Sequence, residues 1–529
     1  MLDLGRSFVA SVERSPDALA IVDNDCRLTY AAWFERVRNI AGGLAGLGIG
    51  HGDHVFAIMQ NRWEMASLHW ACQFLGAIMT PLNWRAKVED IDYCLDNSEA
   101  KAVVFQDVSA EAVAQSTVAR QLPRVAVQSA PGGTLSFDDL LAARPTKQLL
   151  NASWDDWSLM LYTSGTTGRP KGVPRRHQHE RAAAVAHVAQ NLYRRGECTL
   201  GVMPLYHTMG VRSLLAMALI DGCFVCIRKF DVPAVLAAIE TERVTNLYLV
   251  PTLYHDIIEH PNLARTDISS VRKLGFAGAS MNDGLLKRLE AVFKPDLFVN
   301  HYGSSEVYTC TIEPDAVRKP GSAGKSGLNQ RIRVIHLGAT SGDDVASPGE
   351  EGQIVADLRG DEAFEGYWKR PDANAKALRD GWFLTGDMGY FDADGDLFVT
   401  GRVDDMIISG GENISPADIE SLLSLHPAVD EVAVVGLSDE RWGQRVTAFI
   451  KRKSDVAAEA LDRHCRASGL PDYKRPREYV FVEALPKSLV GKILRREILA
   501  GKYTRVPEVG AAASPGSGGA RTIDKREAS

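Results

Sequence analysis

Residues 231–250, "DVPAVLAAIETERVTNLYLV", decide the class of fold. Apolar side chains recur at helical spacing up to Val244, and the following "TNLYLV" is a β-rich run. The alternation continues with strand-like "SVRKLGFAGA" (270–279), amphipathic "NDGLLKRLEAVF" (282–293) and strand-like "DLFVNHYG" (296–303). Strands separated by helices predict parallel sheets covered by helices, with ligands bound at the carboxyl ends of the strands.

The chain changes character after this region, which suggests a second domain. Beyond about residue 330 the strands become shorter and the turns tighter, and we expect a small β-barrel-like part there. From Asp405 a glycine loop, the helical "SPADIESLLSLH" (415–426) and the strand-like "EVAVVGL" (431–437) begin a smaller α+β domain. The small, polar residues 506–529 have little to bury, which predicts a disordered tail.

Composition excludes several classes of protein. A chain of 529 residues is too long for one compact core, and its net charge of −7 provides no basic field for nucleic acid or an anionic membrane. No apolar run reaches the roughly 18–20 residues that cross a bilayer. The start, "MLDLGRSFVASVERSPD", shows no basic segment followed by an apolar one, so we expect a cytoplasmic protein without a secretory signal.

The eight cysteines are scattered, which predicts no disulfide framework and fits a reducing compartment. Cys223 and Cys226 have C-x-x-C spacing, but neither a second pair nor histidines follow at zinc-ligand spacing. The alternating apolar pattern of "GCFVCIRKF" (222–230) predicts a buried strand instead.

The stretch "YFDADGDLFVTGR" (390–402) predicts a hairpin. Its aspartates, Asp392, Asp394 and Asp396, have the spacing of a calcium loop. However, glycine is not at the sixth position of that pattern, and no glutamate stands at the twelfth. We therefore expect a plain turn.

The glycine-rich "LYTSGTTGRPKG" (161–172) follows an apolar run and predicts an anion-binding loop. Glycines allow close backbone approach, and the hydroxyls with Lys171 complement negative oxygens; we expect Lys171 to lead into a helix. The Walker spacing fails, because Pro170 stands five residues after Gly165 and Gly172 follows the lysine. A dinucleotide G-x-G-x-x-G pattern fails as well.

This loop resembles the phosphate loop of the AMP-forming adenylating enzymes, which include acyl-CoA synthetases. Four further stretches resemble motifs of the same family, in the same order along the chain. They are "YGSSE" (302–306), "GWFLTGDMGYFDADG" (381–395), "GRVDDMIISGGENISPADIE" (401–420) and "PKSLVGKILRRE" (486–497). The resemblance implies an N-terminal adenylate-forming domain (1–401), a hinge (402–404) at Asp404, and a mobile C-terminal domain (405–505).

The resemblance also implies the reaction and the roles of the residues. A carboxylate attacks ATP to give an acyl-AMP and pyrophosphate, and CoA then displaces AMP. Lys492 bridges the carboxylate and the α-phosphate, Ser305 completes the motif that carries Glu306, and Glu306 holds Mg²⁺. The implied ATP and AMP contacts are Thr163, Ser164, Gly165, Thr166, Thr167, Gly168, Lys171, Gly278, Ala279, Ser280, Asn300, His301, Tyr302, Gly303, Asp387 and Arg402.

For the acid and for CoA, the resemblance is to 4-chlorobenzoate–CoA ligase and related aryl-CoA ligases. It rests on "MPLYH" (203–207), "FAGAS", "RWGQRVTA" and "YKRPREY". The implied acid-pocket residues are His207, Thr208, Met209, Tyr248, Ala279, His301, Gly303, Tyr308 and Thr309, with Ala186 as a further candidate. The implied CoA contacts are Gly410, Gly411, Trp442, Tyr473 and Arg475, together with Arg85 of the large domain.

The acid itself stays open at this level. Polar groups at His301, Tyr308, Thr309 and Thr208 favour a hydroxybenzoate-like acid, since buried donors discriminate against analogues that leave them unpaired. The small Ala186 keeps a medium-chain or alicyclic acid possible. A carrier protein is the alternative acceptor, although no carrier domain is fused here, and the oligomeric state is undetermined.

Overall fold

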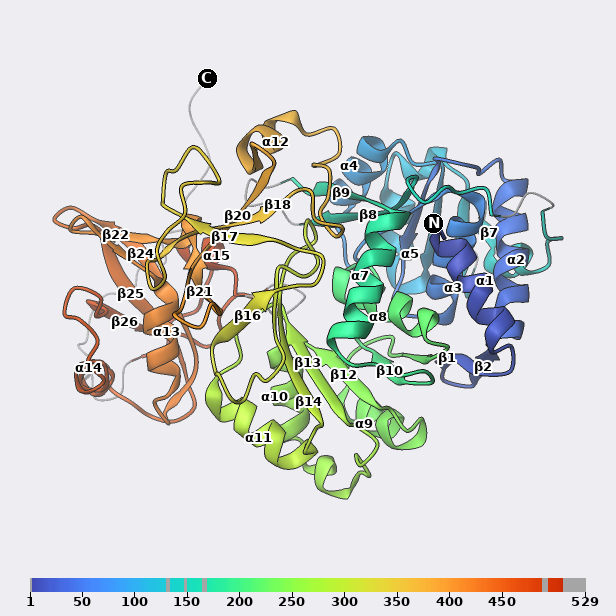
Figure 1. The fold of residues 1–529 in the computed structure, drawn as a ribbon. Coiled ribbons are helices and arrows are strands. Elements are labelled where there is room, and N and C mark those ends of the chain that lie inside the picture. Colours follow the sequence, from blue (N-terminus) through green and yellow to red (C-terminus); the bar gives the residue numbers. More distant parts are fainter. Residues whose placement is uncertain (1, 130–133, 147–149, 164–168, 488–492, 508–529) are drawn as a thin grey trace, which may run out of the picture. The chain divides into compact units, whose positions relative to one another are not determined.

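The computed structural model describes residues 2–129, 134–146, 150–163, 169–487 and 493–507. Backbone contacts divide the chain into two compact units, Met1–Val403 and Asp404–Ser529. The large unit contains two sheets and the helices that cover them, and the small unit contains a third sheet (Figure 1).

The first sheet of the large unit has seven strands in the order β7-β6-β5-β3-β4-β8-β9. All neighbours are parallel except β8 and β9. The strands are β3 (His54–Ile58), β4 (Ile78–Pro81), β5 (Ala102–Gln106), β6 (Arg124–Val127), β7 (Leu135–Ser136), β8 (Trp157–Thr163) and β9 (Lys171–Arg176). The helices of this region are α1 (Leu4–Arg14), α2 (Tyr30–Gly46), α3 (Trp63–Leu75), α4 (Val88–Ser98), α5 (Asp107–Gln115), η1 (Ala119–Gln121) and α6 (Phe137–Leu141).

The second sheet has fourteen strands, and its parallel half runs β14-β13-β12-β10-β11-β1, with β2 antiparallel at the edge. These strands are β1 (Leu19–Asp23), β2 (Cys26–Thr29), β10 (Cys198–Gly201), β11 (Cys223–Cys226), β12 (Asn246–Leu249), β13 (Lys273–Ala277) and β14 (Leu297–Tyr302). The helices here are α7 (His177–Gln190), α8 (Thr208–Leu219), α9 (Val232–Thr241), α10 (Pro251–Glu259), η2 (Pro261–Arg265) and α11 (Asp283–Phe293).

The other half of the second sheet is antiparallel and continues from β14. It contains β15 (Thr311–Glu313), β16 (Ser322–Ser326), β17 (Ile332–Ile335), β18 (Gly352–Asp357), β19 (Leu378–Arg379), β20 (Trp382–Phe391) and β21 (Leu397–Arg402), with helix α12 (Pro371–Ala377). This half carries the short strands and tight turns that the sequence predicts beyond residue 330.

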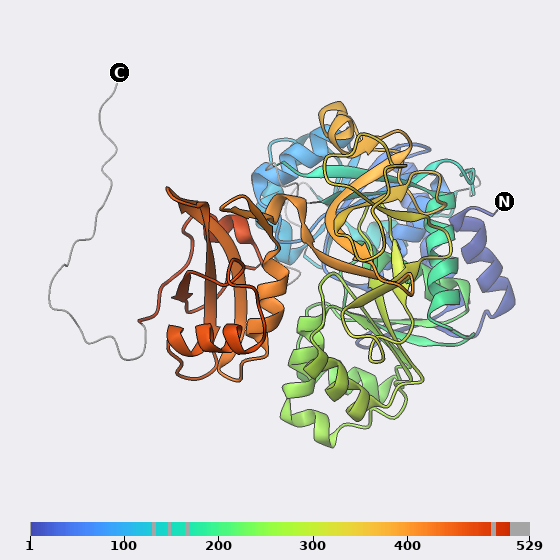
Figure 2. The same ribbon diagram turned by 60° about the vertical axis from the view of Figure 1, so that its left-hand side comes forward.

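The small unit packs helices against the sheet β23-β22-β25-β24, to which β26 adds beside β25 (Figure 2). Its strands are β22 (Ile407–Ser409), β23 (Glu412–Ile414), β24 (Val429–Asp439), β25 (Gly443–Arg452) and β26 (Glu478–Phe481). Its helices are α13 (Pro416–Ser424), α14 (Ala458–Ala467) and α15 (Arg495–Leu499), and the short η3 (Val403–Asp405) precedes them. Side chains from α13, α14, β24 and β25 share one buried core.

Local sequence accounts for much of this arrangement. Asp231 accepts from the N–H of Ala234 at the start of α9, and a proline in the first turn adds the fixed φ of a helix start. The expected helix and strand of residues 231–250 are therefore α9 and β12. The C-x-x-C stretch is β11, with Cys223 and Cys226 buried, as the sequence predicts.

One local expectation was wrong. Lys171 begins strand β9 rather than a helix, and it pairs with Thr163 across an antiparallel hairpin. A proline at position 174 disfavours helical backbone at Val173, and the β8 edge offers hydrogen-bonding partners to an extended chain. No helix N-terminus therefore stands at Lys171, since α7 begins only at His177.

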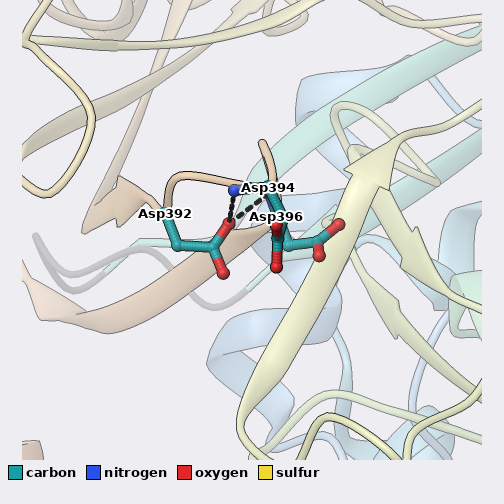
Figure 3. A group of neighbouring side chains, drawn as sticks. All are labelled: Asp392, Asp394 and Asp396. Carbon is teal, nitrogen blue, oxygen red and sulfur yellow. Dashed lines mark hydrogen bonds between the residues drawn. The ribbon is translucent and has the colours of Figure 1, made fainter.

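The acidic turn between β20 and β21 is held by the protein's own cation. Asp392 Oδ1 accepts from the N–H groups of Asp394 at 3.0 Å and Asp396 at 2.9 Å (Figure 3). The ammonium of Lys319 lies 2.6 Å, 3.0 Å and 2.5 Å from carboxylate oxygens of Asp392, Asp394 and Asp396. Lys319 therefore contacts all three carboxylates of this turn, which connects β20 and β21 as the hairpin expected from the sequence.

Within the described ranges, no helix combines the length and the apolar character needed to cross a bilayer.

Candidate active site

Asp387 and Arg402 form the first part of the site, because the β20–β21 ladder pairs them directly. Arg402 Nη1 lies 2.8 Å from Asp387 Oδ1, and the hydroxyl of Tyr302 donates to Oδ2 at 2.6 Å. Burial, reinforced by the Asp387 charge, raises the pKa of Tyr302, which keeps that hydroxyl protonated. Arg402 and Tyr302 thus hold the Asp387 carboxylate through both of its oxygens.

A second group joins a lysine, a tyrosine and a glutamate. The Tyr367 hydroxyl donates to Glu306 Oε1 at 2.7 Å, and the Lys171 ammonium lies 4.2 Å from the Tyr367 ring centroid. Burial lowers the pKa of Lys171, while the Glu306 carboxylate acts in the opposite direction. Burial also raises the pKa of Tyr367, so its hydroxyl remains a donor. Tyr367 is a site residue that the sequence motifs do not contain.

The turn of "YGSSE" determines where Glu306 stands. Ser304 Oγ accepts from the N–H groups of Glu306 at 3.2 Å and Val307 at 3.3 Å, and the Ser304 N–H donates to the Val307 carbonyl at 2.8 Å. A Cβ on Gly303 would lie 2.2 Å from the carbonyl oxygen of Tyr308, so only glycine fits there. Ser305 lies half-buried in this turn.

The Glu306 carboxylate has the properties of a magnesium ligand. Its carboxylate is buried, at 8% exposure, and Tyr367 satisfies one of its oxygens. In the described part of the chain, no side chain donates to the other oxygen within hydrogen-bond distance. Mg²⁺ bound with a nucleotide takes one or two protein carboxylates and completes its shell from phosphates and water.

The expected adenine contacts follow two adjacent parallel strands. Gly278, with φ of +85°, Ala279 and Ser280 lie exposed directly after β13. On β14, Asn300 Nδ2 donates to the Ser322 carbonyl at 2.7 Å, and His301 is buried opposite Ala277. These residues therefore lie at the carboxyl ends of β13 and β14, where the strand–helix alternation predicts a ligand site.

Some expected contacts are outside the described residues. They are Lys492 and the loop residues Ser164, Gly165, Thr166, Thr167 and Gly168. The flanking Thr163 and Lys171 pair across the β8–β9 hairpin.

The expected acid-pocket residues come together around helix α8. His207 is the N-cap of α8 and its ring accepts from the N–H of Met209 at 3.4 Å. Met209 and Tyr248 share a buried apolar cluster with Met203, Val250 and Ala277. Thr208, Tyr308 and Thr309 are buried as well.

Sequence reasoning missed the polar network behind this pocket. Arg212, one turn beyond Met209 on α8, is 2% exposed. Its Nη1 donates to Thr309 Oγ1 at 2.5 Å and to the Tyr308 carbonyl at 3.2 Å, and its Nη2 donates to the Tyr248 hydroxyl. The signal was present, because Arg212 is the single charge in the apolar run "TMGVRSLLAMAL".

Glu362 supplies the nearby negative charge. Its carboxylate accepts from the N–H of Thr309 at 3.0 Å and from Asn329 Nδ2 at 3.1 Å. Burial raises the pKa of Glu362, and Arg212 is the largest influence that opposes the shift. Arg212 thus bonds the Thr309 hydroxyl and Glu362 accepts from its N–H, so both the side chain and the main chain of Thr309 are held.

His187 and Asn191 complete the network. The His187 ring centroid lies 4.8 Å from that of Tyr248 and 5.4 Å from that of His301, and the last two are 5.1 Å apart. Asn191 contacts both histidine rings. Neither residue belongs to a motif, and they come together only through folding. His187 follows the expected Ala186 on α7, which is also buried.

The expected CoA contacts of the small unit fall in two places: Gly410, Gly411 and Trp442 adjoin β22 and β25, and Tyr473 and Arg475 follow α14. Gly410 and Gly411 have φ of +63° and +89°, and a Cβ on Gly410 would lie 2.9 Å from the Trp442 ring. Tyr473 is exposed, and Arg475 pairs with Asp462 at 3.4 Å. In the large unit, Arg85 is exposed and stacks 3.5 Å over the Trp84 ring. Their role toward CoA stays a prediction.

The described residues on either side of positions 488–492 have contacts within the small unit. Lys487 and Ile493, on either side of the residues not described, pair in a β-bridge. Arg495 Nη2 lies 2.6 Å from Glu420 Oε2, and its Nη1 lies 3.2 Å from Asp405 Oδ2. Arg495 therefore ties the terminal lysine motif to the start of the unit, beside the expected hinge residue Asp404.

Comparison with known proteins agrees with these features. The sequence profile of the AMP-binding enzyme family matches residues 8–368, and that of the AMP-binding enzyme C-terminal domain matches residues 418–492. A feruloyl-CoA synthase of Amycolatopsis sp is 35% identical over 94% of this chain and 98% of its own. A 4-chlorobenzoate–CoA ligase of Arthrobacter sp is 32% identical over 92% and 93%.

A solved structure shows the same fold. The o-succinylbenzoate coenzyme A synthetase of Bacillus subtilis, in complex with ATP and magnesium ion, superposes with a TM-score of 0.81 at 27% identity. The match covers 93% of this chain and 98% of that one. The chain belongs to the AMP-binding enzyme family. It is an AMP-forming acid–thiol ligase of the acyl-CoA synthetase class, a family that ATP and CoA fit as substrates.

Proposed function

We propose that the protein activates an aromatic carboxylic acid of the benzoate or hydroxybenzoate type to an acyl-AMP and transfers the acyl group to CoA. The observation that carries the choice of acid is the buried ring cluster of Tyr248, His301 and His187 beside Met209. Flat aromatic and imidazole faces suit a flat ring, and the relatives named above are named for aromatic acids.

The first half-reaction needs positive charge more than acid–base chemistry. The acid is already ionised near neutral pH, so no base is required, but its charge repels the triphosphate. Lys492 bridges the carboxylate and the α-phosphate, and Lys171 neutralises the pyrophosphate end. Asp387 accepts from the ribose hydroxyls, with its orientation held by Tyr302 and Arg402.

Glu306 would hold magnesium through the carboxylate oxygen that Tyr367 does not engage. A bound cation would supply positive charge that offsets the charge of the phosphates. Tyr367 keeps the other Glu306 oxygen engaged and so fixes the direction of the carboxylate.

The second half-reaction requires a change at the hinge. Residues 1–401 form the adenylating domain and 405–505 the mobile domain, which rotates about Asp404 within residues 402–404. Rotation withdraws Lys492 and brings the Gly410–Gly411 loop to the path of the CoA thiol. The thiol sulfur attacks the acyl carbon, the bond to the AMP phosphate oxygen breaks, and AMP leaves.

The location proposed is the cytoplasm. All eight cysteines are free thiols, and seven of them are buried.

A pyrophosphate-release assay with CoA tests the proposed function. The panel contains benzoates, hydroxybenzoates, cinnamates, alicyclic acids and medium-chain acids. We expect an aromatic acid to give the highest kcat/KM. A strong preference for octanoate over every benzoate would contradict the aromatic assignment and leave the ligase chemistry intact. Replacing CoA by a carrier protein in the same assay distinguishes the two acceptors.

A further inference from the structure

The proton positions around the acid pocket are fixed by a chain of hydrogen bonds that begins at Asn191. Its Nδ2 donates to the backbone carbonyl of His187 at 2.8 Å, which sets the orientation of the amide. The Asn191 Oδ1 must then accept from His301 Nε2, 3.2 Å away. Burial lowers the pKa of His301 well below its ordinary value, so the ring is neutral. Its proton is therefore on Nε2, and Nδ1 is an acceptor.

The same amide sets the state of the neighbouring ring. Asn191 Nδ2 lies 3.0 Å from His187 Nδ1, so that nitrogen accepts. Burial lowers the pKa of His187 as well, and the neutral ring carries its proton on Nε2. Among the described residues, neither His187 Nε2 nor His301 Nδ1 has a hydrogen-bond partner, although both side chains are buried.

Arg212 determines the direction of the third proton, which belongs to the Tyr248 hydroxyl. A guanidinium only donates, so the Tyr248 oxygen must accept from Arg212 Nη2 and its own proton must point elsewhere. Tyr248 is 1% exposed, and no described residue stands as an acceptor for that proton. The ring centroids of Tyr248 and His301 are 5.1 Å apart. One buried donor and one buried acceptor therefore belong to neighbouring side chains.

Such an arrangement is costly unless a ligand completes it. A buried polar group without a partner costs about 1–3 kcal/mol, and here the donors of Tyr248 and His187 and the acceptor of His301 are left over. A group that accepts and donates at once satisfies them together. A hydroxyl does so, whereas a hydrogen, a halogen or a carboxylate on the same ring position does not.

Resting on the proposed aromatic-acid activity, we propose that Tyr248 and His301 select an acid that carries a ring hydroxyl. The hydroxyl oxygen accepts from Tyr248, with His187 Nε2 as a second donor nearby, and the hydroxyl proton is donated to His301 Nδ1. Arg212 and Asn191 are positioning residues, because they fix the protons of Tyr248 and His301 without touching the acid. Glu362 balances the charge of Arg212 from behind Thr309.

The test compares matched acids in the wild-type protein and two variants. The acids are benzoate, its 2-, 3- and 4-hydroxy derivatives, and terephthalate, each assayed by pyrophosphate release. Tyr248→Phe removes one oxygen, and His301→Phe removes the acceptor. The matched control is Tyr254→Phe, a buried tyrosine whose hydroxyl donates to the carbonyls of Leu247 and Gly275 instead.

We expect the wild-type kcat/KM for one hydroxybenzoate to exceed that for benzoate by at least about tenfold. Tyr248→Phe and His301→Phe should each reduce this ratio of kcat/KM values about tenfold or more. Tyr254→Phe should lower thermal stability and leave the ratio unchanged.

Several results would overturn the inference. It fails if benzoate is activated but no hydroxy isomer is preferred, or if Tyr248→Phe reduces turnover of both acids alike. A preference for terephthalate would assign the network to a second carboxylate, bound by the charge of Arg212. If instead octanoate is activated and no benzoate is, the proposed function itself is wrong. If either variant does not fold, the other variant and the wild-type preference still decide the matter.

Discussion

Arg402 and Asp387 lie directly opposite each other in the β20–β21 ladder, with Arg402 Nη1 2.8 Å from Asp387 Oδ1. Asp387 also accepts from Tyr302 at 2.6 Å, so its orientation depends on two strands besides its own. Such a pair binds a ligand without rearranging, because the protein has already fixed the acceptor.

Asp387→Asn should raise the KM for ATP about tenfold or more. The amide keeps the shape but loses the charge and half of the acceptor capacity that two ribose hydroxyls need. The KM for the acid should change little. Initial-rate assays of pyrophosphate release measure both constants, with Asp394→Asn as the control, since that carboxylate is 79% exposed in the acidic turn. Equal KM values for ATP in both variants would contradict the role given to Asp387.

Lys492→Ala should abolish adenylation and spare thioester formation from supplied acyl-AMP. Only the first half-reaction builds negative charge on the α-phosphate, and loss of such a charged contact typically costs about 10²–10³-fold. Lys487→Ala is the control, because Lys487 belongs to the same sequence motif as Lys492 but pairs with Glu431. Pyrophosphate release at the full rate in Lys492→Ala would disprove the mechanism.

Glu306→Gln should increase the Mg²⁺ concentration needed for half-maximal adenylation. An amide oxygen is a weaker ligand than a carboxylate for a hard cation. Tyr367→Phe should have a smaller effect in the same direction, because it only releases the carboxylate from its 2.7 Å hydrogen bond. Magnesium titrations at saturating ATP measure both effects, and unchanged magnesium dependence in Glu306→Gln would exclude it as a ligand.

Gly410→Ala should slow thioester formation and leave adenylation intact. The added Cβ would lie 2.9 Å from the Trp442 ring, in a backbone with φ of +63°. Gly469→Ala is a matched control in the same unit, since its φ is +77° and no atom lies within 4 Å of the added Cβ. The two half-reactions are measured separately, the second from supplied acyl-AMP. Equal rates of thioester formation in the two variants would show that backbone strain alone, and not the close approach to Trp442, slows the reaction.

Stability should decline as the pH falls below about 6.5, the ordinary pKa of histidine. Burial lowers the pKa of His54 to about 4, of His69 to about 3 and of His177 to about 4 in the folded protein. The unfolded chain therefore binds more protons between pH 6.5 and 4. Each histidine then reduces the free energy of unfolding by up to about 1.4 kcal/mol per pH unit.

Above pH 6.5 these histidines contribute no pH dependence. The loss of stability is measured as the change in the urea concentration at half-unfolding between pH 7.5 and pH 4.5. In His69→Leu, the slope of the free energy of unfolding against pH should be smaller by the contribution of about one proton. Leucine does not titrate, whereas the buried His69 takes up its proton on unfolding. An identical slope would contradict the neutral state assigned to His69.

Local patterns were sufficient for much of the fold and insufficient for part of the site. The helix–strand alternation of residues 231–250 is a property of adjacent residues, and it predicted α9 and β12. The sequence wrongly predicted a helix at Lys171, because glycine-rich loops that precede helices and those that connect the strands of hairpins have similar composition. Its strand depends on pairing with β8, which is a tertiary fact.

The site divides in the same way. Asp387, Arg402 and Glu306 stand in motifs, so a resemblance finds them. Tyr367 bonds a residue 61 positions away, and Asn191 bonds His301 across 110 positions. No local pattern carries such separations. Arg212 was also missed, although a local signal for it existed, since a lone charge in an apolar helix needs a buried partner.

The single carboxylate oxygen of Glu306 has a consequence for the kinetic order of substrate addition. One oxygen cannot hold an octahedral cation on its own, so the described residues provide no preformed resting place for magnesium. If Glu306 holds magnesium, the cation would enter with the nucleotide, and the rate would follow the concentration of the magnesium–nucleotide complex rather than that of free ATP. The magnesium–pyrophosphate complex would then compete with the incoming nucleotide.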